Sequence, residues 1–154
     1  MGTITKALTM EHAVFSVVFE QIEHLFGRMT SAPEVKLMAS LVEGLLSGHG
    51  EAEKHLAYAA LDHVLEEKGE LHRLHQDHQE IDSHFRRVQG ATDLVEARRL
   101  LKKALAASRE HFRREEKHVF PLLERTLRAD TLGDLGQAWM RNYPQYLPAA
   151  AASV

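Results

Sequence analysis

The chain has 154 residues, 44% hydrophobic and 27% charged, a balance typical of one globular domain with its own core. A net charge of −3 argues against a general nucleic-acid binder or a basic membrane-surface protein. No apolar run is long enough to cross a bilayer, the N-terminus lacks a signal-peptide core, and there is no cysteine. We therefore expect a cytoplasmic protein. Its unusual feature is 11 histidines, since histidine is the commonest metal ligand.

Apolar residues recur with helical periodicity along nearly the whole chain, and no strand-like alternation persists. Ser31 with Glu34 forms a capping box before the second helix, and Asp93 opens the fourth. A short fifth helix is expected between Leu132 and Asn142. The four long helices are predicted over residues 4–28, 32–67, 70–89 and 93–128.

Short loops between long amphipathic helices predict an all-α fold. We expect an antiparallel up-down four-helix bundle over residues 1–128, followed by a short C-terminal helix or tail. Residues 129–154 are then a C-terminal extension that packs on the bundle or is partly disordered.

Three glycines interrupt the second predicted helix, in the stretch EGLLSGHGE. A glycine inside a helix costs up to about 1 kcal/mol relative to alanine. One interpretation is a kink, or two helices in place of one. The other is that small residues let a second helix or a ligand approach His49.

A His-x-x-x-Glu motif occurs twice. The stretches GHGEAEKHLAY and EHFRREEKHVF align, which places His49 against His111 and Glu53 against Glu115. A second alignment, of MEHAVFSVVFEQI with QDHQEIDSHFRRV, gives each motif a further histidine from the helix before it. The chain therefore offers six candidate metal ligands: His12, His49, Glu53, His78, His111 and Glu115.

The spacing of each motif explains why it suits a metal. Residues four apart lie on one helix face, with Cβ atoms about 5–6 Å apart, so both side chains can reach one centre. Four imidazoles and two carboxylates are too many for one tetrahedral ion and fit two ions, with both carboxylates bridging. Nitrogen and oxygen ligands without sulfur favour Fe or Mn, with Zn as an alternative. A metal-free bundle would have to bury the same groups without a cation, at high cost.

These motifs resemble the hemerythrin family in its bacterial HHE-domain form. The matching residues are His12 in MEH, His78 in QDH and both His-x-x-x-Glu motifs, the second followed by Phe-Pro in HFRREEKHVFPLLE. The resemblance covers about residues 5–128. It implies a non-haem di-iron centre with a bridging oxo or hydroxo species, in proteins that bind or sense dioxygen, handle nitric oxide or peroxide, or handle iron.

We accordingly expect two iron ions in the bundle core, with Mn or Zn less favoured. The expected partner is a small molecule (dioxygen, peroxide or nitric oxide), with no nucleic acid and no membrane, and the chain is expected to be a monomer or a homodimer. In this assignment His12 and His49 hold one iron, His78 and His111 hold the other, and Glu53 and Glu115 bridge them.

One position departs from the family pattern. Oxygen-carrying hemerythrins have His-x-x-x-His on the third helix, which gives one iron a third imidazole, but here Leu74 stands four residues before His78. His75, three residues before His78, shares part of that face. Either His75 is a fifth imidazole, or each iron keeps two histidines and the bridging groups. The second outcome leaves open sites and favours reactivity over reversible oxygen carriage.

Two classes of function therefore remain open. One is a protein that senses, stores or delivers dioxygen or nitric oxide. The other is a di-iron oxidoreductase that breaks down peroxide, reduces nitric oxide or oxidises an organic substrate. An iron-handling protein and a metal-free interaction bundle are further alternatives.

Expectations for the residues around the site are less specific. Glu11 and Asp77 are expected to face water. Tyr58 is expected to pack in the core, with a role near bound oxygen as the alternative. His118 lies seven residues after His111 and is expected to return to the core-facing stripe two turns later.

Overall fold

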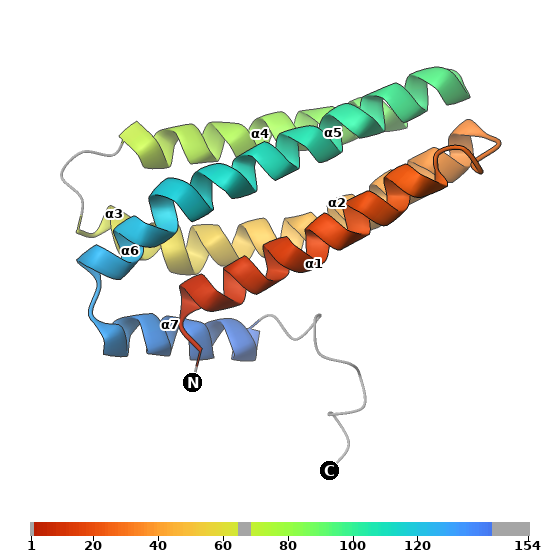
Figure 1. Ribbon diagram of the computed structural model, residues 1–154. Helices are drawn as coiled ribbons and strands as arrows, with labels where there is room; N and C mark the ends of the chain where they lie inside the picture. The colour runs from red at the N-terminus through yellow and green to blue at the C-terminus, as the bar shows by residue number, and fades with distance from the viewer. Residues whose placement is uncertain (1, 65–68, 143–154) are drawn as a thin grey trace, which may run out of the picture.

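The computed structural model describes residues 2–64 and 69–142, and every regular element in those ranges is helical (Figure 1). The all-α expectation is confirmed for them. No helix in the described ranges is both long enough and apolar enough to cross a membrane. The elements are α1 (Ile4–Leu25), α2 (Ala32–Ala52), η1 (Glu53–Tyr58), α3 (Ala59–Asp62), α4 (Gly69–Gln89), α5 (Leu94–Arg114), η2 (Glu115–Val119), α6 (Phe120–Thr126) and α7 (Ala129–Asn142), where η marks a π-helix.

Four long helical stretches lie alongside one another, and α7 lies near the N-terminal end of α1 (Figure 1). α4 packs along α5, and α2 contacts both of them. Gly136 permits the contact of α7 with the N-terminus, because a Cβ there would clash with the Gly2 carbonyl oxygen and the Thr3 backbone. The rest of the predicted C-terminal extension, residues 143–154, lies outside the described residues.

The predicted helix starts at Ser31 and Asp93 are confirmed. The Ser31 backbone N–H donates to a Glu34 carboxylate oxygen at 3.1 Å, as a capping box requires. The Glu96 backbone N–H donates to Asp93 Oδ1 at 2.8 Å. Local sequence signals therefore fix where α2 and α5 begin.

Both helices that carry a His-x-x-x-Glu motif contain a π-helical segment that the sequence pattern did not predict. η1 begins at Glu53 and η2 begins at Glu115. A π turn holds more residues than an α turn, so the face that points into the core shifts along the chain. The expectation for His118 is wrong for this reason: His118 is exposed, and Val119 takes the buried place.

Two apolar clusters fill the interior and leave a polar layer between them. Along α1, Leu8 belongs to one cluster and Phe15 to the other, and His12 falls between them. Along α4, Leu74 and Ile81 flank His78 in the same way. The candidate ligands therefore lie at the level where the apolar core is interrupted, closed off from solvent on both sides.

The glycine-rich part of α2 is one continuous α-helix, so the alternative of two helices in place of one is wrong at these glycines. A Cβ at Gly44 would meet nothing within 4 Å. A Cβ at Gly50 would lie 3.6 Å from Cε1 of His78, which supports the reading that a small residue here lets the neighbouring helix bring its histidine close.

Replacing Gly44 by alanine is expected to raise the free energy of unfolding by up to about 1 kcal/mol, because alanine has the higher helix propensity and its methyl group meets open space. Urea unfolding followed by circular dichroism measures the change. Gly27→Ala is the matched control, since Gly27 has equally open surroundings but lies in a turn. A lower urea midpoint for Gly44→Ala than for the parent chain would contradict the prediction.

Candidate metal centre

His12 from α1 and His49 from α2 form the first pair of imidazoles. Their Nε2 atoms lie 3.0 Å apart, and both side chains are buried. Oε1 of Glu53 lies 2.8 Å from Nε2 of His49 and 3.6 Å from Nε2 of His12. Two ring nitrogens and one carboxylate oxygen thus converge on one small volume.

His78 from α4 and His111 from α5 form a second pair, with Nε2 atoms 2.8 Å apart. The other oxygen of Glu53, Oε2, lies 3.1 Å from Nε2 of His78 and 3.8 Å from Nε2 of His111. The two oxygens of Glu53 therefore face different histidine pairs, which is the geometry of a bridging carboxylate.

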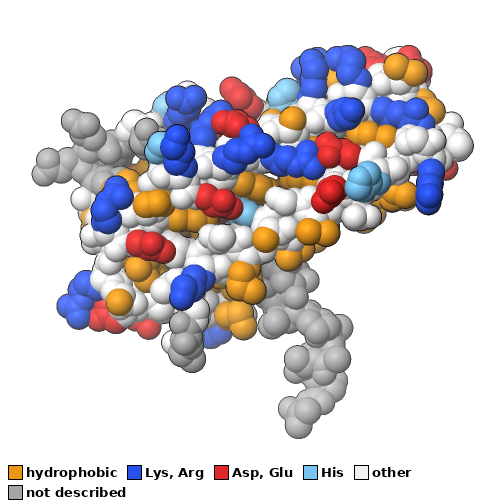
Figure 2. Space-filling view, viewed as in Figure 1, with side chains coloured by type: hydrophobic (Ala, Val, Ile, Leu, Met, Phe, Trp, Pro, Cys, Tyr) orange, Lys and Arg blue, Asp and Glu red, His pale blue; other side chains and the backbone are white. Residues whose placement is uncertain are grey.

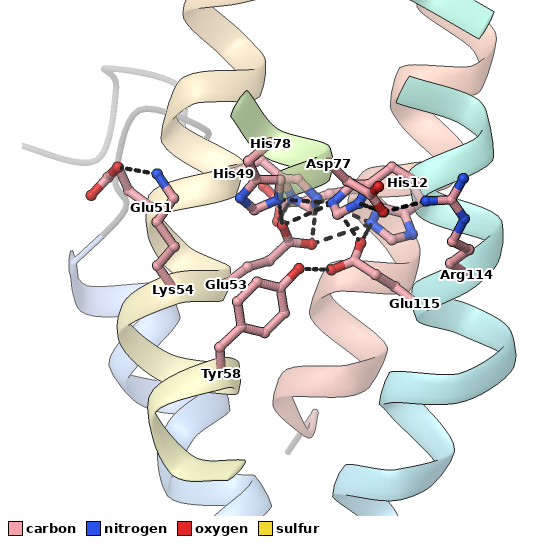
Figure 3. Close-up of polar contacts among 12 residues, drawn as sticks. His12, His49, Glu51, Glu53, Lys54, Tyr58, Asp77, His78, Arg114 and Glu115 are labelled. Atoms are coloured by element: carbon pink, nitrogen blue, oxygen red, sulfur yellow. Dashed lines mark hydrogen bonds and ion pairs between the residues drawn. The ribbon is translucent and has the colours of Figure 1, made fainter. Parts of the chain in front are cut away.

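Glu115 also links the pairs, but with a single oxygen. Its Oε2 lies 3.4 Å from Nε2 of His12 and 3.4 Å from Nε2 of His111. Its Oε1 accepts a short hydrogen bond from the hydroxyl of Tyr58. Figure 3 shows the side chains of Glu53, Tyr58 and Glu115 pointing toward one another from the surrounding helices.

The six predicted ligands therefore come together as two overlapping groups that share Glu53 and Glu115. In each group the candidate ligand atoms lie within 4.8 Å of one another. The pairing of histidines is the one expected from the repeat. One group able to hold a metal ion consists of His12, His49, Glu53 and Glu115. The other consists of Glu53, His78, His111 and Glu115. Metal binding by these residues remains a prediction.

Two buried histidines of this layer have raised pKa values. Burial alone would lower the pKa of His49, but the charge of Glu53 and the hydrogen bond with Glu11 outweigh it and raise that pKa to about 10. The pKa of His111 is likewise raised to about 10, because Glu115 and Asp77 outweigh the effect of burial. Without a metal, protons on the imidazoles supply the positive charge that the buried carboxylates need.

Three more carboxylates hold the outer nitrogens of the rings. Glu116 Oε1 lies 2.9 Å from Nδ1 of His12, and Glu11 Oε2 lies 3.0 Å from Nδ1 of His49. Such contacts fix the orientation of a ligand ring and make it a better donor.

The third carboxylate is Asp77, whose Oδ2 lies 3.6 Å from Nδ1 of His111 and also accepts from Arg114. The interaction with the His111 ring and then the hydrogen bond from Arg114 lower the pKa of Asp77 to about 2. The expectation that Glu11 and Asp77 face water is wrong, since both are buried. In the sequence, an acidic residue directly precedes His12 and another directly precedes His78. This repeated pattern could have indicated that Glu11 and Asp77 belong to the site.

Tyr58 does more than pack. Its ring stacks on that of His78 with centroids 5.8 Å apart, and its hydroxyl donates to Glu115. Burial and then the charge of Glu53 raise the pKa of Tyr58 well above its ordinary value. The phenol therefore keeps its proton beside the carboxylates.

The structure brings His75 to neither ligand group. His75 is exposed and makes an edge contact with the ring of Tyr58 at 5.5 Å. Leu74 is buried in an apolar cluster together with Tyr58. Of the two outcomes left open by the sequence, the geometry favours two histidines in each half of the centre.

Comparison with known proteins bears directly on this site. Residues 3–130 match the Hemerythrin HHE cation binding domain. The chain belongs to the hemerythrin family. Comparison with curated proteins and with solved structures gives no match.

The donor set suits the cation that a hemerythrin domain binds. Among the described residues, Glu53 Oε1 and Glu115 Oε2 are buried and accept no hydrogen bond. Buried carboxylate oxygens without donors are costly unless a cation meets them. Neutral imidazole and carboxylate ligands without sulfur fit a first-row transition metal. The residues present therefore fit a metal.

Loading metal at pH 7 is expected to release at least about two protons per chain, because the raised pKa values keep His49 and His111 protonated without metal, and both must give up those protons to bind. Metal affinity should therefore rise with pH up to about 10. Titration calorimetry in two buffers of different ionisation enthalpy counts the protons. Uptake without proton release would show that the imidazoles are neutral beforehand.

Glu11→Gln is expected to weaken metal affinity about 10- to 100-fold, because a neutral amide no longer supports the imidazole of His49. Competition with a chromophoric chelator measures the affinity. Glu20→Gln is the control, since Glu20 lies exposed on the same helix. Equal affinities for the two variants would remove Glu11 from the site.

Proposed function

We propose that this chain is a non-haem di-iron protein that binds or reacts with dioxygen, peroxide or nitric oxide in the core of an antiparallel four-helix bundle. The observation that carries the proposal is the position of Glu53, whose two oxygens face two separate histidine pairs. Family membership supports a cation at this place.

In this proposal each iron takes two imidazoles and shares both carboxylates. His12 and His49 hold one ion, His78 and His111 hold the other, and Glu53 and Glu115 lie between them. When bound, the iron pair supplies the electrons for binding or reducing a small oxygen or nitrogen species.

The protein's own contribution is to orient the ligands, exclude water and hold protons. Glu11 and Asp77 orient His49 and His111 through their outer ring nitrogens. Apolar clusters on both sides of the layer keep bulk water away. Tyr58 holds a proton at its hydroxyl next to Glu115, one of the two proposed bridging carboxylates.

Between binding and catalysis, one observation favours an enzyme. Leu74 occupies the place where oxygen carriers have a further histidine, and it is packed among apolar side chains. An iron with only two imidazoles keeps more positions open to exogenous ligands. A di-iron oxidoreductase acting on peroxide, nitric oxide or dioxygen is therefore our preferred form of the proposal, and reversible binding is the alternative.

Optical spectroscopy separates the two forms. Dioxygen is added to the anaerobic di-ferrous protein and the spectrum is followed. A stable absorption band that disappears on removing oxygen supports binding. Rapid conversion to a di-ferric spectrum, or sustained gas evolution with hydrogen peroxide, supports the enzyme.

Glu53→Ala and Glu115→Ala are each expected to bind less than one iron per chain and to lose the stability that metal binding gives the fold, because each carboxylate serves both ions. Metal analysis and thermal unfolding of iron-treated samples measure both effects. Glu20→Ala is the control, since Glu20 is an exposed carboxylate on α1. Full iron retention in both site variants would defeat the bridging assignment.

A further inference from the structure

The two halves of the centre are built from a repeat, and two of the differences between the aligned stretches bear on the first-helix histidines. In the alignment of GHGEAEKHLAY with EHFRREEKHVF, Gly50 stands against Phe112 and Lys54 against Glu116. Phe112 and Glu116 both contact His12. Gly50 and Lys54 lie near His78, the counterpart of His12.

His12 is held from two directions. The ring of Phe112 stacks on it, with centroids 4.0 Å apart and an interplanar angle of 14°. Glu116 lies 2.9 Å from its Nδ1. Only 2% of its side chain is exposed.

His78, the counterpart of His12, lacks both supports. Gly50 offers no side chain to stack on it, and Lys54 is paired with Glu51 at 3.0 Å. Nδ1 of His78 is buried and has no hydrogen-bond partner among the described residues. Its side chain is 12% exposed, against 2% for each of the other three histidines.

A cavity of about 110 Å³ lies at this less supported histidine, between α2 and α4, with α5 beside them. Histidines of the centre line it, and so do the exposed residues Ser47 and Glu51 of α2. Its lining includes both histidines of the second pair, His78 and His111, one histidine of the first pair, His49, and also Ser47, Gly50 and Lys54.

Two larger cavities do not serve the centre in this way. One, of about 850 Å³ between α1 and α7, reaches inward to Glu11 and Phe15. The other, of about 530 Å³, touches Glu116 and Phe120. None of the six predicted ligands lines either of them. Figure 2 shows apolar side chains gathered on the face that carries α1 and α7.

We propose that the cavity between α2 and α4 is the entry for small neutral ligands, and that it delivers them to the ion held by His78 and His111. The inference rests on the proposed di-iron function and adds which ion is open. Each liquid water occupies about 30 Å³, so the cavity of about 110 Å³ accommodates a molecule of about three or four heavy atoms and excludes larger organic substrates. Glu51 and Asp82 at the lining offset Lys54, which favours neutral molecules over anions.

The test is the association rate of nitric oxide, a neutral diatomic probe, with the full-length di-ferrous protein by stopped-flow absorbance. Gly50→Ala places a methyl group in the cavity and is compared with Gly44→Ala on the same helix, where the methyl meets open space. Ser47→Trp obstructs the lining and is compared with Ser16→Trp on the exposed face of α1. We expect both cavity variants to slow association about tenfold, and both controls to stay within about twofold of the parent chain.

Iron content distinguishes the ways this test can fail. If all variants hold two irons and associate with nitric oxide at the parent rate, ligands enter elsewhere and this inference is overturned while the proposed function stands. If the parent chain holds less than one iron, both fail together.

A second measurement tests whether His78 is the weakly held ligand. Lys54→Glu supplies the carboxylate that Glu116 gives to His12, and it is expected to slow iron release to an external chelator about tenfold. Lys54→Gln controls for loss of the positive charge. Equal release rates for the two variants would show that His78 gains nothing from a partner and would overturn the assignment of the open half.

Discussion

Burial of two carboxylates among four imidazoles is the constraint on which the rest of this structure depends. Glu53 and Glu115 are fully buried, and uncompensated charges at such depth are strongly unfavourable. Positive charge must therefore lie between the helices, as protons on the rings or as metal. The candidate ligands come from α1, α2, α4 and α5 and from both π segments. The positive charge that compensates the two carboxylates therefore also holds the four long helical stretches together.

The π segments follow from the same site. Each begins at the glutamate of a His-x-x-x-Glu motif. Single π turns inside α-helices are frequent at functional sites. In an α-helix, a residue five places after Glu53 would point well away from it. The wider turn of η1 brings Tyr58 closer to the face of Glu53, where its hydroxyl reaches Glu115. A single local distortion thus adds a proton donor to the layer.

Sequence reasoning identified the six central residues because the signal was periodic and occurred twice. The helix starts at Ser31 and Asp93 were equally readable, since capping depends on residues next to one another. Glu11 was missed because its partner is His49 on another helix, and only packing brings the two together. The exposure of His118 was missed because α-helical periodicity cannot anticipate a π turn.

The repeat also explains why the two carboxylates act differently. Tyr58 and Phe120 occupy aligned positions, and each ring stacks on a histidine of the centre, at 5.8 Å and 5.5 Å. Only Tyr58 has a hydroxyl. That hydroxyl occupies one oxygen of Glu115, which leaves the other oxygen to face both histidine pairs, whereas Glu53 keeps both oxygens for them. The hydroxyl that Tyr58 has and Phe120 lacks therefore makes the two carboxylates different. Both oxygens of Glu53 face the histidine pairs, but only one oxygen of Glu115 does.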